Sequence, residues 1–289
     1  MRWIGRRESA NVEDRRGGRA VRLGVGGGIG GLVLLLLYVF LGGDPSRILE
    51  NLPEEARVGD PGEAVPGAPY QESAEEEQLR KFVSVVLAET EQTWHQVFSQ
   101  MGRAYEEPKL VLFTDAVDSA CGFAQAAVGP FYCPANQKVY IDLGFYRELQ
   151  ERFGAPGDFA QAYVIAHEIG HHVQNLLGIS DRIQAAQARA GQEEANELSV
   201  RLELQADCLA GVWGNHAQES QQLLEAGDIE EGLSAASAIG DDRVQMESQG
   251  YIAPESFTHG SSAQRVRWFR RGIESGRLDA CDTFGARDL

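Results

Sequence analysis

The sequence predicts an α+β protein, mainly helical with a small sheet, preceded by one transmembrane helix. Three observations predict this class. An uncharged apolar stretch lies near the start, two short apolar stretches ("PKLVLFT" and "QKVYIDL") predict strands, and segments with helical spacing fill most of the remainder. The 289 residues are 43% hydrophobic and 24% charged, which is ordinary for a globular protein with a substantial core.

The apolar stretch predicts a membrane anchor. Residues 23–41, "LGVGGGIGGLVLLLLYVFL", would form about 28 Å of helix, enough to cross a hydrocarbon core. A cleaved signal peptide is the alternative, but the basic region before the stretch is long and "LGGDPSR" offers no good cleavage site. Seven arginines precede the stretch, so residues 1–22 should stay in the cytoplasm and the body should face the periplasm, with a single pass through the inner membrane.

The charge distribution bears on possible partners. Residues 1–22 hold seven arginines against three acids, a net of +4, so the remaining residues carry −17 − 4 = −21. A body this acidic would repel a phosphate backbone, which argues against nucleic acid as a partner. Glycines four residues apart in the apolar stretch would let two such helices pack closely, which leaves a homodimer through this helix open.

The rest of the chain divides into a linker and one domain. Residues 42–78 hold five prolines, many glycines and acids, and few large apolar residues, a composition typical of an unfolded linker. Residues 79–289 form the domain. It opens with "EQLRKFVSVVLAETEQTWHQVFSQM", whose apolar residues recur at the spacing of an amphipathic helix.

Four cysteines fit an oxidising compartment beyond the membrane. Cys121 and Cys133 bracket the short segment "CGFAQAAVGPFYC", and Cys208 and Cys281 remain. Sequence alone allows three pairings, of which we expect the local pair together with Cys208–Cys281. A zinc–thiolate site is the competing interpretation, but the chain has no CxxC spacing.

The segment "YVIAHEIGHHVQN", residues 163–175, predicts a helix with two histidines on one face. His167 and His171 are one turn apart, and most of the remaining circumference is apolar, so both imidazoles should be enclosed and need partners. A zinc ion, which favours nitrogen ligands, would supply a partner to each. Glu168 points about 100° aside, where it can reach a water molecule beside the ion, as a general base must.

A zinc ion needs a third protein ligand. In the pattern HExxHxxGxxH that ligand is a histidine, but Gln174 and Leu177 occupy the two diagnostic positions here, so that class is excluded. In residues 195–216, "ANELSVRLELQADCLAGVWGNH", Glu203 and Asp207 share the helix side that should be buried.

A buried acid pair without a cation is costly. We therefore expect Glu203 to bind the metal and Asp207 to orient a ligand histidine through a hydrogen bond. A salt bridge to an arginine is the alternative explanation for the pair.

These motifs resemble known proteases. "HEIGH" followed some thirty residues later by "ELQAD" is similar to the gluzincin arrangement of the CAAX-prenyl and heat-shock membrane proteases, in which the glutamate of an E-x-x-A-D motif is the third ligand. Nearly everything after residue 79 resembles the bacterial family of neutral zinc metallopeptidases, single-pass proteins of the cell envelope. The shared motifs are "CGFAQAAVGPFYCPANQKVYIDLGFY", "HEIGHHVQNLLGI", "ELQADCLAGVW" and "FTHGSSAQRVRWFRRG".

The resemblance implies a zincin-like metallopeptidase domain with Zn²⁺ as cofactor and a peptide or protein as substrate. It also implies that His259, followed by Arg265, supports the reacting carbonyl, although Gly260 stands where the related T-H-P segment has proline. The alternative is that His259 caps a turn and Arg265 belongs to the basic helix "RVRWFRRG". An edge strand in "PANQKVYIDLGFY" would pair with an extended substrate, unless this strand is interior. His172 falls on the far side of its helix and is predicted to be a core residue.

We therefore expect a membrane-anchored zinc endopeptidase. His167, His171 and Glu203 would hold the metal, Glu168 would act as general base, and zinc together with His259 would stabilise the oxyanion. Two other functions stay open: an anchored scaffold or chaperone on an inactive protease fold, and a zinc hydrolase of a non-peptide amide such as a cell-wall crosslink. The presence of every ligand and the base disfavours the scaffold.

Overall fold

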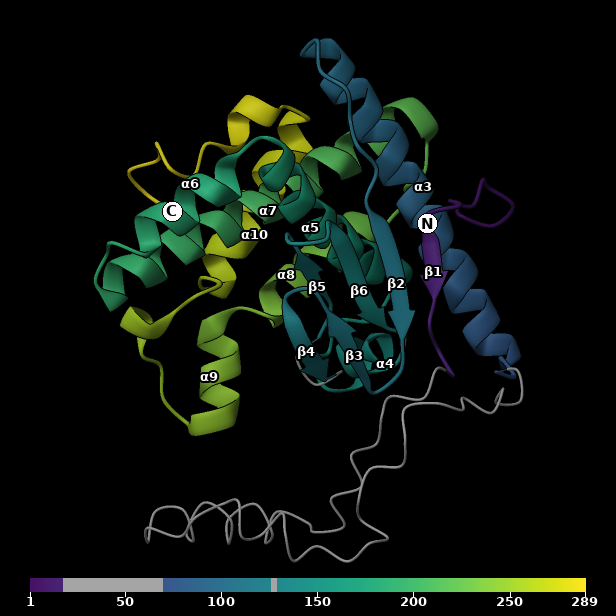
Figure 1. The fold of residues 1–289 in the computed structure, drawn as a ribbon, viewed down its shortest axis with the longest axis horizontal. Coiled ribbons are helices and arrows are strands. Elements are labelled where there is room, and N and C mark those ends of the chain that lie inside the picture. Colours follow the sequence, from purple (N-terminus) through teal and green to yellow (C-terminus); the bar gives the residue numbers. More distant parts are fainter. Residues whose placement is uncertain (18–69, 126–128) are drawn as a thin grey trace, which may run out of the picture. The chain divides into compact units, whose positions relative to one another are not determined.

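The two predicted strands lie side by side at the centre of a four-stranded sheet. The computed structural model describes residues 1–17, 70–125 and 129–289. In it β2 (Lys109–Phe113) and β6 (Lys138–Asp142) are parallel neighbours, as their buried apolar runs require. β1 (Val12–Asp14) adds in parallel to β2, and β5 (Phe131–Cys133) adds antiparallel to β6, so the order is β1-β2-β6-β5 (Figure 1). A separate hairpin consists of β3 (Ala116–Ser119) and β4 (Gly122–Gln125).

Helices account for most of the other described residues, which confirms the mainly helical α+β class. They are α3 (Ala74–Gln100), α4 (Phe145–Glu151), α5 (Asp158–Leu176), α6 (Ile179–Gln187), α7 (Gln192–Gln221), α8 (Asp228–Ala238), α9 (Asp241–Gln249) and α10 (Ser262–Ser275), with short 3-10 turns at Pro254–Ser256 and Leu278–Cys281. α3 begins before the predicted boundary at residue 79, because Ser73 and Glu76 form a capping box that starts the helix at Ala74.

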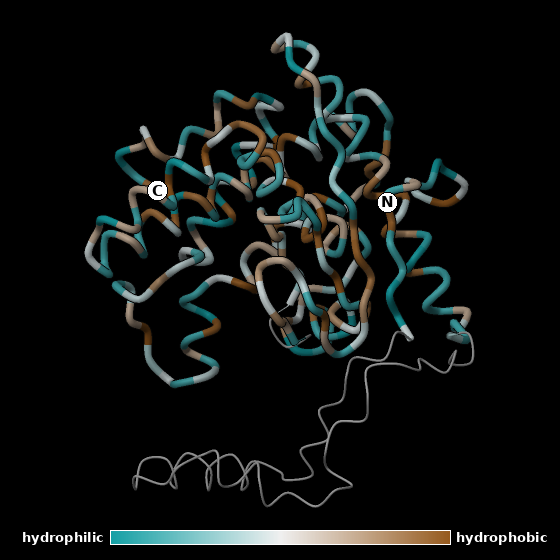
Figure 2. The backbone as a smooth tube through the Cα atoms, in the orientation of Figure 1, coloured by the Kyte–Doolittle hydropathy of each residue, from teal (hydrophilic) through white to brown (hydrophobic). Residues whose placement is uncertain are grey.

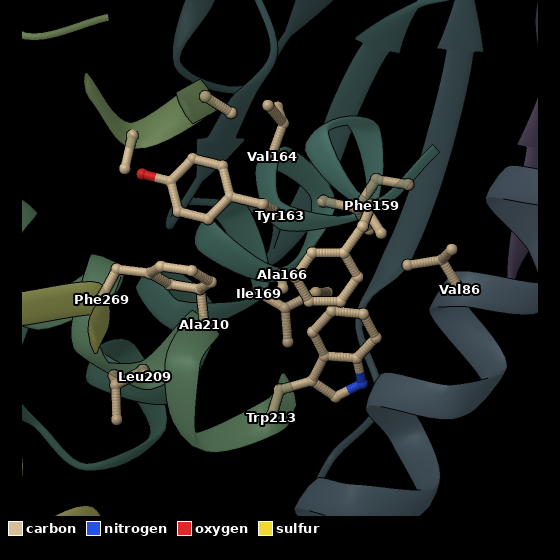
Figure 3. Close-up of a cluster of buried hydrophobic side chains, with 14 of the residues drawn as sticks. Val86, Phe159, Tyr163, Val164, Ala166, Ile169, Leu209, Ala210, Trp213 and Phe269 are labelled. Carbon is tan, nitrogen blue, oxygen red and sulfur yellow. The ribbon is translucent and has the colours of Figure 1, made fainter. Parts of the chain in front are cut away.

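The main core lies where α5 and α7 meet α3, α8 and α10. Figure 3 shows rings from three of these helices converging: Phe159 and Tyr163 of α5, Trp213 of α7 and Phe269 of α10. The rings of Phe159 and Trp213 stack with centroids 5.9 Å apart. Burying each such side chain contributes roughly 1.5–3 kcal/mol. Figure 2 shows the same segregation along the chain, with hydrophobic stretches in the strands and inner helices.

Two glycines bring α7 and α10 into backbone contact. A Cβ atom on Gly272 would collide with the carbonyl oxygen of Cys208, and one on Gly211 would collide with the carbonyl oxygen of Phe269. Because both positions lack a side chain, α10 lies directly against the part of α7 that follows Asp207. This close approach places the first turn of α10 beside the predicted metal site.

Both expected disulfides are present. Cys121–Cys133 joins the β3–β4 turn to the end of β5, and Cys208–Cys281 joins α7 to the C-terminal 3-10 turn. All four cysteines of the chain are therefore paired.

The predicted membrane span, residues 23–41, lies outside the described residues, as does most of the predicted linker, residues 42–78. Within the part of the chain that the structure describes, no helix is both long and apolar enough to cross a bilayer.

The first residues of the chain require a correction. We expected residues 1–22 to form a cytoplasmic segment separate from the domain, but Met1–Arg16 belong to the same compact unit as Glu72–Leu289. Arg6 and Arg7 of this segment meet the acidic Glu89 and Glu91 of α3. The Arg6 guanidinium donates to Glu89 at 3.2 Å and to the carbonyl of Gln221 at 2.7 Å.

The contact between Arg6 and Glu89 should contribute to stability. Glu89 is 6% exposed, so Arg6→Ala would leave a buried carboxylate without its cation, and we expect the free energy of unfolding to fall by roughly 1–3 kcal/mol. Arg2→Ala is the matched control, because the Arg2 guanidinium is exposed and lies 3.7 Å from the exposed Glu225. Denaturant unfolding should show a change below about 0.5 kcal/mol for this variant. Equal losses for the two variants would contradict the assignment.

Candidate metal and active site

α5 carries the histidine motif in its buried middle. Gly157 precedes the helix with φ 116°, a conformation that favours glycine, and Asp158 places an acid in the first turn. His167 and Glu168 are 6% and 7% exposed, and the His171 side chain is mostly buried. The predicted enclosure of both imidazoles is therefore present.

α7 brings Glu203 to the two histidines. One carboxylate oxygen lies 3.1 Å from Nε2 of His167 and the other lies 3.4 Å from Nε2 of His171. Three atoms bound tetrahedrally at the usual zinc distances are roughly 3.3 Å apart. The spacing of these side chains therefore matches a three-ligand zinc site, and among the described residues their ligating atoms all lie within 4.8 Å of one another.

The hydrogen bonds at the other ring nitrogens define which tautomers fit. Nδ1 of His167 lies 2.8 Å from Asp207, and Nδ1 of His171 lies 2.9 Å from Oε1 of Gln174. Both partners are acceptors, so Nδ1 keeps a proton in each ring, and loss of the Nε2 proton would free a lone pair for a metal. A cation at this point would then lie between the two imidazoles and the Glu203 carboxylate. This donor set fits zinc.

The electrostatics of the site point the same way. Burial alone would lower the pKa of His167, but Asp207 and Glu203 outweigh it and raise the pKa to about 10. Burial would raise the pKa of Glu203, but His171 and His167 hold it well below its usual range. The side chains thus favour positive charge at the two imidazoles, where a metal cation would sit.

Asp207 is the centre of a buried network. Its carboxylate is fully buried and accepts hydrogen bonds from Nδ1 of His167, from the hydroxyl of Tyr163 at 2.5 Å, and from two guanidinium nitrogens of Arg265 at 2.8 Å each. Burial would raise the pKa of Asp207, but Arg265 and His167 lower it to about 2. The metal interpretation and the arginine salt bridge, which the sequence posed as alternatives for the acid pair, are therefore compatible.

Arg265 acts through Asp207. The arginine is 2% exposed, lies in α10 and donates to Asp207, Tyr163 and the carbonyl of Ile239. Its hydrogen bonds hold the carboxylate that orients His167. Arg265 does belong to the basic helix, as the alternative stated, but its side chain is buried against Asp207.

Gln174 was not predicted as a functional residue. It is fully buried, accepts from His171 and donates to the carbonyl of Leu202 and to Gln205. The side-chain amide nitrogen of Gln174 donates to α7, and this fixes the side-chain oxygen in the position where it accepts from His171. The signal was present in the sequence, since Gln174 lies three residues after His171 on the same helix face.

Glu168 lies beside the ligands with its carboxylate held by the sheet. Burial raises the pKa of Glu168, against the opposing effect of the histidine charges and of a hydrogen bond from the backbone N–H of Tyr132 in β5. Tyr132 is itself fixed to α5, because its hydroxyl bonds to Nδ1 of His172 at 3.0 Å. His172 is fully buried and satisfied by Tyr132 and the carbonyl of Glu106, which confirms it as a core residue.

His259 enters the site from a loop organised by Asp241. One oxygen of Asp241 accepts from three successive backbone N–H groups, those of Thr258, His259 and Gly260, and the other lies 3.2 Å from Nδ1 of His259. The hydrogen bond to Asp241 is the main cause that raises the pKa of His259. Gly260 has φ 91°, which proline cannot adopt, so the turn differs from a T-H-P segment as expected.

One cleft of about 600 Å³ is present at the site. Its walls include the ligands, Glu168, His259 and Arg265, and an apolar side with Phe131, Tyr132, Phe145, Phe153 and Val164. The sheet edge at the cleft is β5. The strand in "PANQKVYIDLGFY" is β6, which is interior between β2 and β5, so its prediction as the edge strand was wrong. The hairpin that pairs β5 with β6 covers that edge.

The fold and the site define an α+β protein with a candidate metal site shared by two helices and a buried glutamate beside it. The chain belongs to the family described as "Putative neutral zinc metallopeptidase", whose model matches residues 1–284. The description of this family indicates zinc-dependent peptidase activity, and hence a hydrolase.

Relatives of the chain occur in distant bacteria. The YpfJ protein of Escherichia coli (strain K12) is 50% identical over 296 residues, covering 99% of each chain. The Rv2575 protein of Mycobacterium tuberculosis (strain H37Rv) is 41% identical over 262 residues, covering 87% of this chain and 86% of its own. No solved structure shows a significant match.

The ligand set predicts the metal content. The purified protein should bind about one zinc per chain, and His171→Ala or Glu203→Ala should lose most of it, because three protein ligands define such a site. His95→Ala is the matched control, since His95 is half-exposed on α3 and bonds only to Glu107 in the described residues. Elemental analysis after dialysis measures the content. Full occupancy in Glu203→Ala would place the third ligand elsewhere.

Gln174 should affect zinc affinity without being a ligand. Gln174→Leu removes the acceptor that holds the tautomer of His171, and zinc affinity should fall roughly 10- to 100-fold, as is usual for partners of ligand histidines. Gln184→Leu, at an exposed position lining the same cleft, should leave the affinity unchanged. Competition with a chelator measures both. Equal affinities for the two variants would show that Gln174 does not orient His171.

Proposed function

We propose that the protein is a zinc-dependent endopeptidase. The observation that carries the proposal is the convergence of His167, His171 and Glu203 on one point of a cleft, with the buried Glu168 beside them. Membership of the zinc metallopeptidase family supports it. Zinc bound by these three side chains would supply a Lewis acid that polarises a carbonyl and activates water.

Glu168 would move the proton in this reaction. Its carboxylate is enclosed, and burial raises its pKa, which makes it a stronger base than an exposed carboxylate. It would take a proton from the attacking water and pass it to the leaving amine. The Tyr132 N–H keeps the carboxylate directed into the cleft.

His259 would support the developing charge on the reacting carbonyl. Its Nδ1 faces Asp241 and the residue lines the cleft, so the ring can donate from Nε2 when it is protonated. The bond to Asp241 raises its pKa and so favours the donating form.

The substrate would bind as an extended peptide along β5. Among the described residues this strand pairs only with β6, and Phe131 and Tyr132 line the cleft. The Tyr132 N–H is engaged by Glu168, so the other backbone groups at this edge would pair with an added strand, and the neighbouring apolar wall would receive apolar side chains. The Tyr132–His172 contact holds this edge at a constant distance from the ligands.

We also propose that the body works outside the cytoplasm, at the inner membrane. The two disulfides support an oxidising compartment. Residues 23–41, which lie outside the described residues, would supply the membrane attachment, and their glycine spacing would allow a homodimer.

The decisive variant is Glu168→Gln. Glutamine keeps the size of glutamate but cannot accept a proton, so cleavage of a peptide library should fall by at least ~10²-fold. Zinc content and thermal stability should stay close to those of the wild type, because Glu168 is not one of the three ligands.

If Glu168→Gln restores a deletion phenotype as well as the wild type does, the protein is a scaffold. Hydrolysis of cell-wall crosslinks without any peptide cleavage would move the substrate to a non-peptide amide.

A further inference from the structure

The first sixteen residues form a strap that is built into the body. Within Met1–Arg16, β1 extends the sheet with Val12 opposite Leu110 and Asp14 opposite Leu112. The pairing with β2 continues beyond both ends of β1. The Leu110 N–H donates to the carbonyl of Asn11, and the Arg15 N–H donates to the carbonyl of Leu112. The strap therefore completes an edge of the sheet that would otherwise offer unpaired backbone groups.

The strap also provides the partners of two acids on α3. Glu89 and Glu91 are 6% and 1% exposed. Arg6 donates to Glu89, while Arg7, the Ser9 hydroxyl and the Asn11 amide donate to Glu91. Carboxylates this deeply buried are costly unless they are paired. The body is therefore complete only when the strap is docked.

Other contacts tie the strap to the far parts of the body. Hydrogen bonds from Lys138 of β6 are the main cause that lowers the pKa of Glu13 to about 2. The ammonium group of Met1 lies 2.8 Å from Asp158, the first residue of α5, and 3.3 Å from Asp228, the first residue of α8. The strap thus contacts the sheet and the start of the helix that carries His167.

The two ends of the intervening chain meet at one place. Arg16, the last residue of the strap, donates to Glu72 at 2.5 Å, and Glu72 also accepts from Arg80 in the first turns of α3. A chain that leaves and re-enters a folded unit at one point crosses a membrane an even number of times or not at all. The 19 apolar residues 23–41 suffice for a single crossing.

We propose that the strap and the catalytic body lie in the same compartment, so that the chain does not pass once through the membrane between them. The contacts of Arg6, Arg7, Asn11 and Glu13 carry this inference, and it does not depend on the proposed peptidase activity. The family model matches from residue 1, so the strap lies within the region that this chain shares with the family. This revises the single-pass topology with a cytoplasmic N-terminus.

Single cysteines report the compartment of each part in the full chain. All four native cysteines are in disulfides, so an added cysteine is the accessible thiol. Ile4→Cys places it on the strap and Tyr251→Cys on the body, at side chains that are 84% and 61% exposed. Intact and permeabilised cells are treated with a maleimide that cannot cross the inner membrane. The proposal expects both variants to be labelled in intact cells, or both only after permeabilisation. Labelling of one but not the other in intact cells would overturn it.

A crosslink tests the docked strap directly. The side chains of Asn11 and Glu107 contact each other at 2.7 Å, so a short bis-maleimide should join the two thiols of the double variant Asn11→Cys/Glu107→Cys in the full chain. With a protease site inserted between residues 42 and 69, cleavage should leave the N-terminal fragment attached under denaturing, non-reducing conditions. Each single variant is the control and should release the fragment. Equal release from the double variant would mean that the strap is not docked, and the proposal would fail. Neither measurement depends on the protein's own peptidase activity, so its outcome is distinct from that of Glu168→Gln.

Discussion

The buried carboxylate of Asp207 is the constraint on which the site depends. It is fully enclosed and accepts from His167 and Tyr163 of α5 and from Arg265 of α10. A carboxylate in the interior is tolerated only when its lone pairs are satisfied. The relative positions of α5, α7 and α10 are therefore determined together, and any shift of one helix would break hydrogen bonds to the other two.

The packing around this network explains how the cleft keeps its geometry. Gly211 and Gly272 let α7 and α10 approach at backbone distance, which is the separation that Arg265 needs to reach Asp207. On the other side, His172 and Tyr132 link α5 to β5. One face of α5 thus carries the two ligand histidines, and another face holds the strand β5 through His172. Such preorganisation is what a hydrolase requires, because small displacements at a reacting centre lower the rate steeply.

Much of the site could be predicted because its residues follow local rules. The four-residue spacing placed His167 beside His171, and Glu203 beside Asp207, on helix faces that the apolar pattern marked as buried. The partners supplied by loops and edges could not be found in this way. Asp241 meets His259 across a separation of 18 residues, and the edge position of β5 results from a hairpin in which only three residues pair. The spacing of apolar residues along the sequence does not indicate such contacts.

The N-terminal arginines have partners that their position in the sequence does not indicate. Their number and their position before an apolar stretch are typical of a cytoplasmic flank. The tertiary structure instead places Arg6 and Arg7 against Glu89 and Glu91. Charge along the chain indicates that cations are present, but it does not indicate which distant acids they meet.

The sequence by itself determined the class of the fold. It also determined that His167 and His171 share one helix face and that Glu168 lies next to them, because periodicity and residue chemistry are local properties. The tertiary structure places Glu203 and Asp207 against the histidines, as the sequence predicted, and it alone shows that Gln174 contacts His171 and that the strap forms part of the sheet. These arrangements depend on which buried polar groups satisfy one another across tens to hundreds of residues. That matching is a property of the packed chain and not of any single segment.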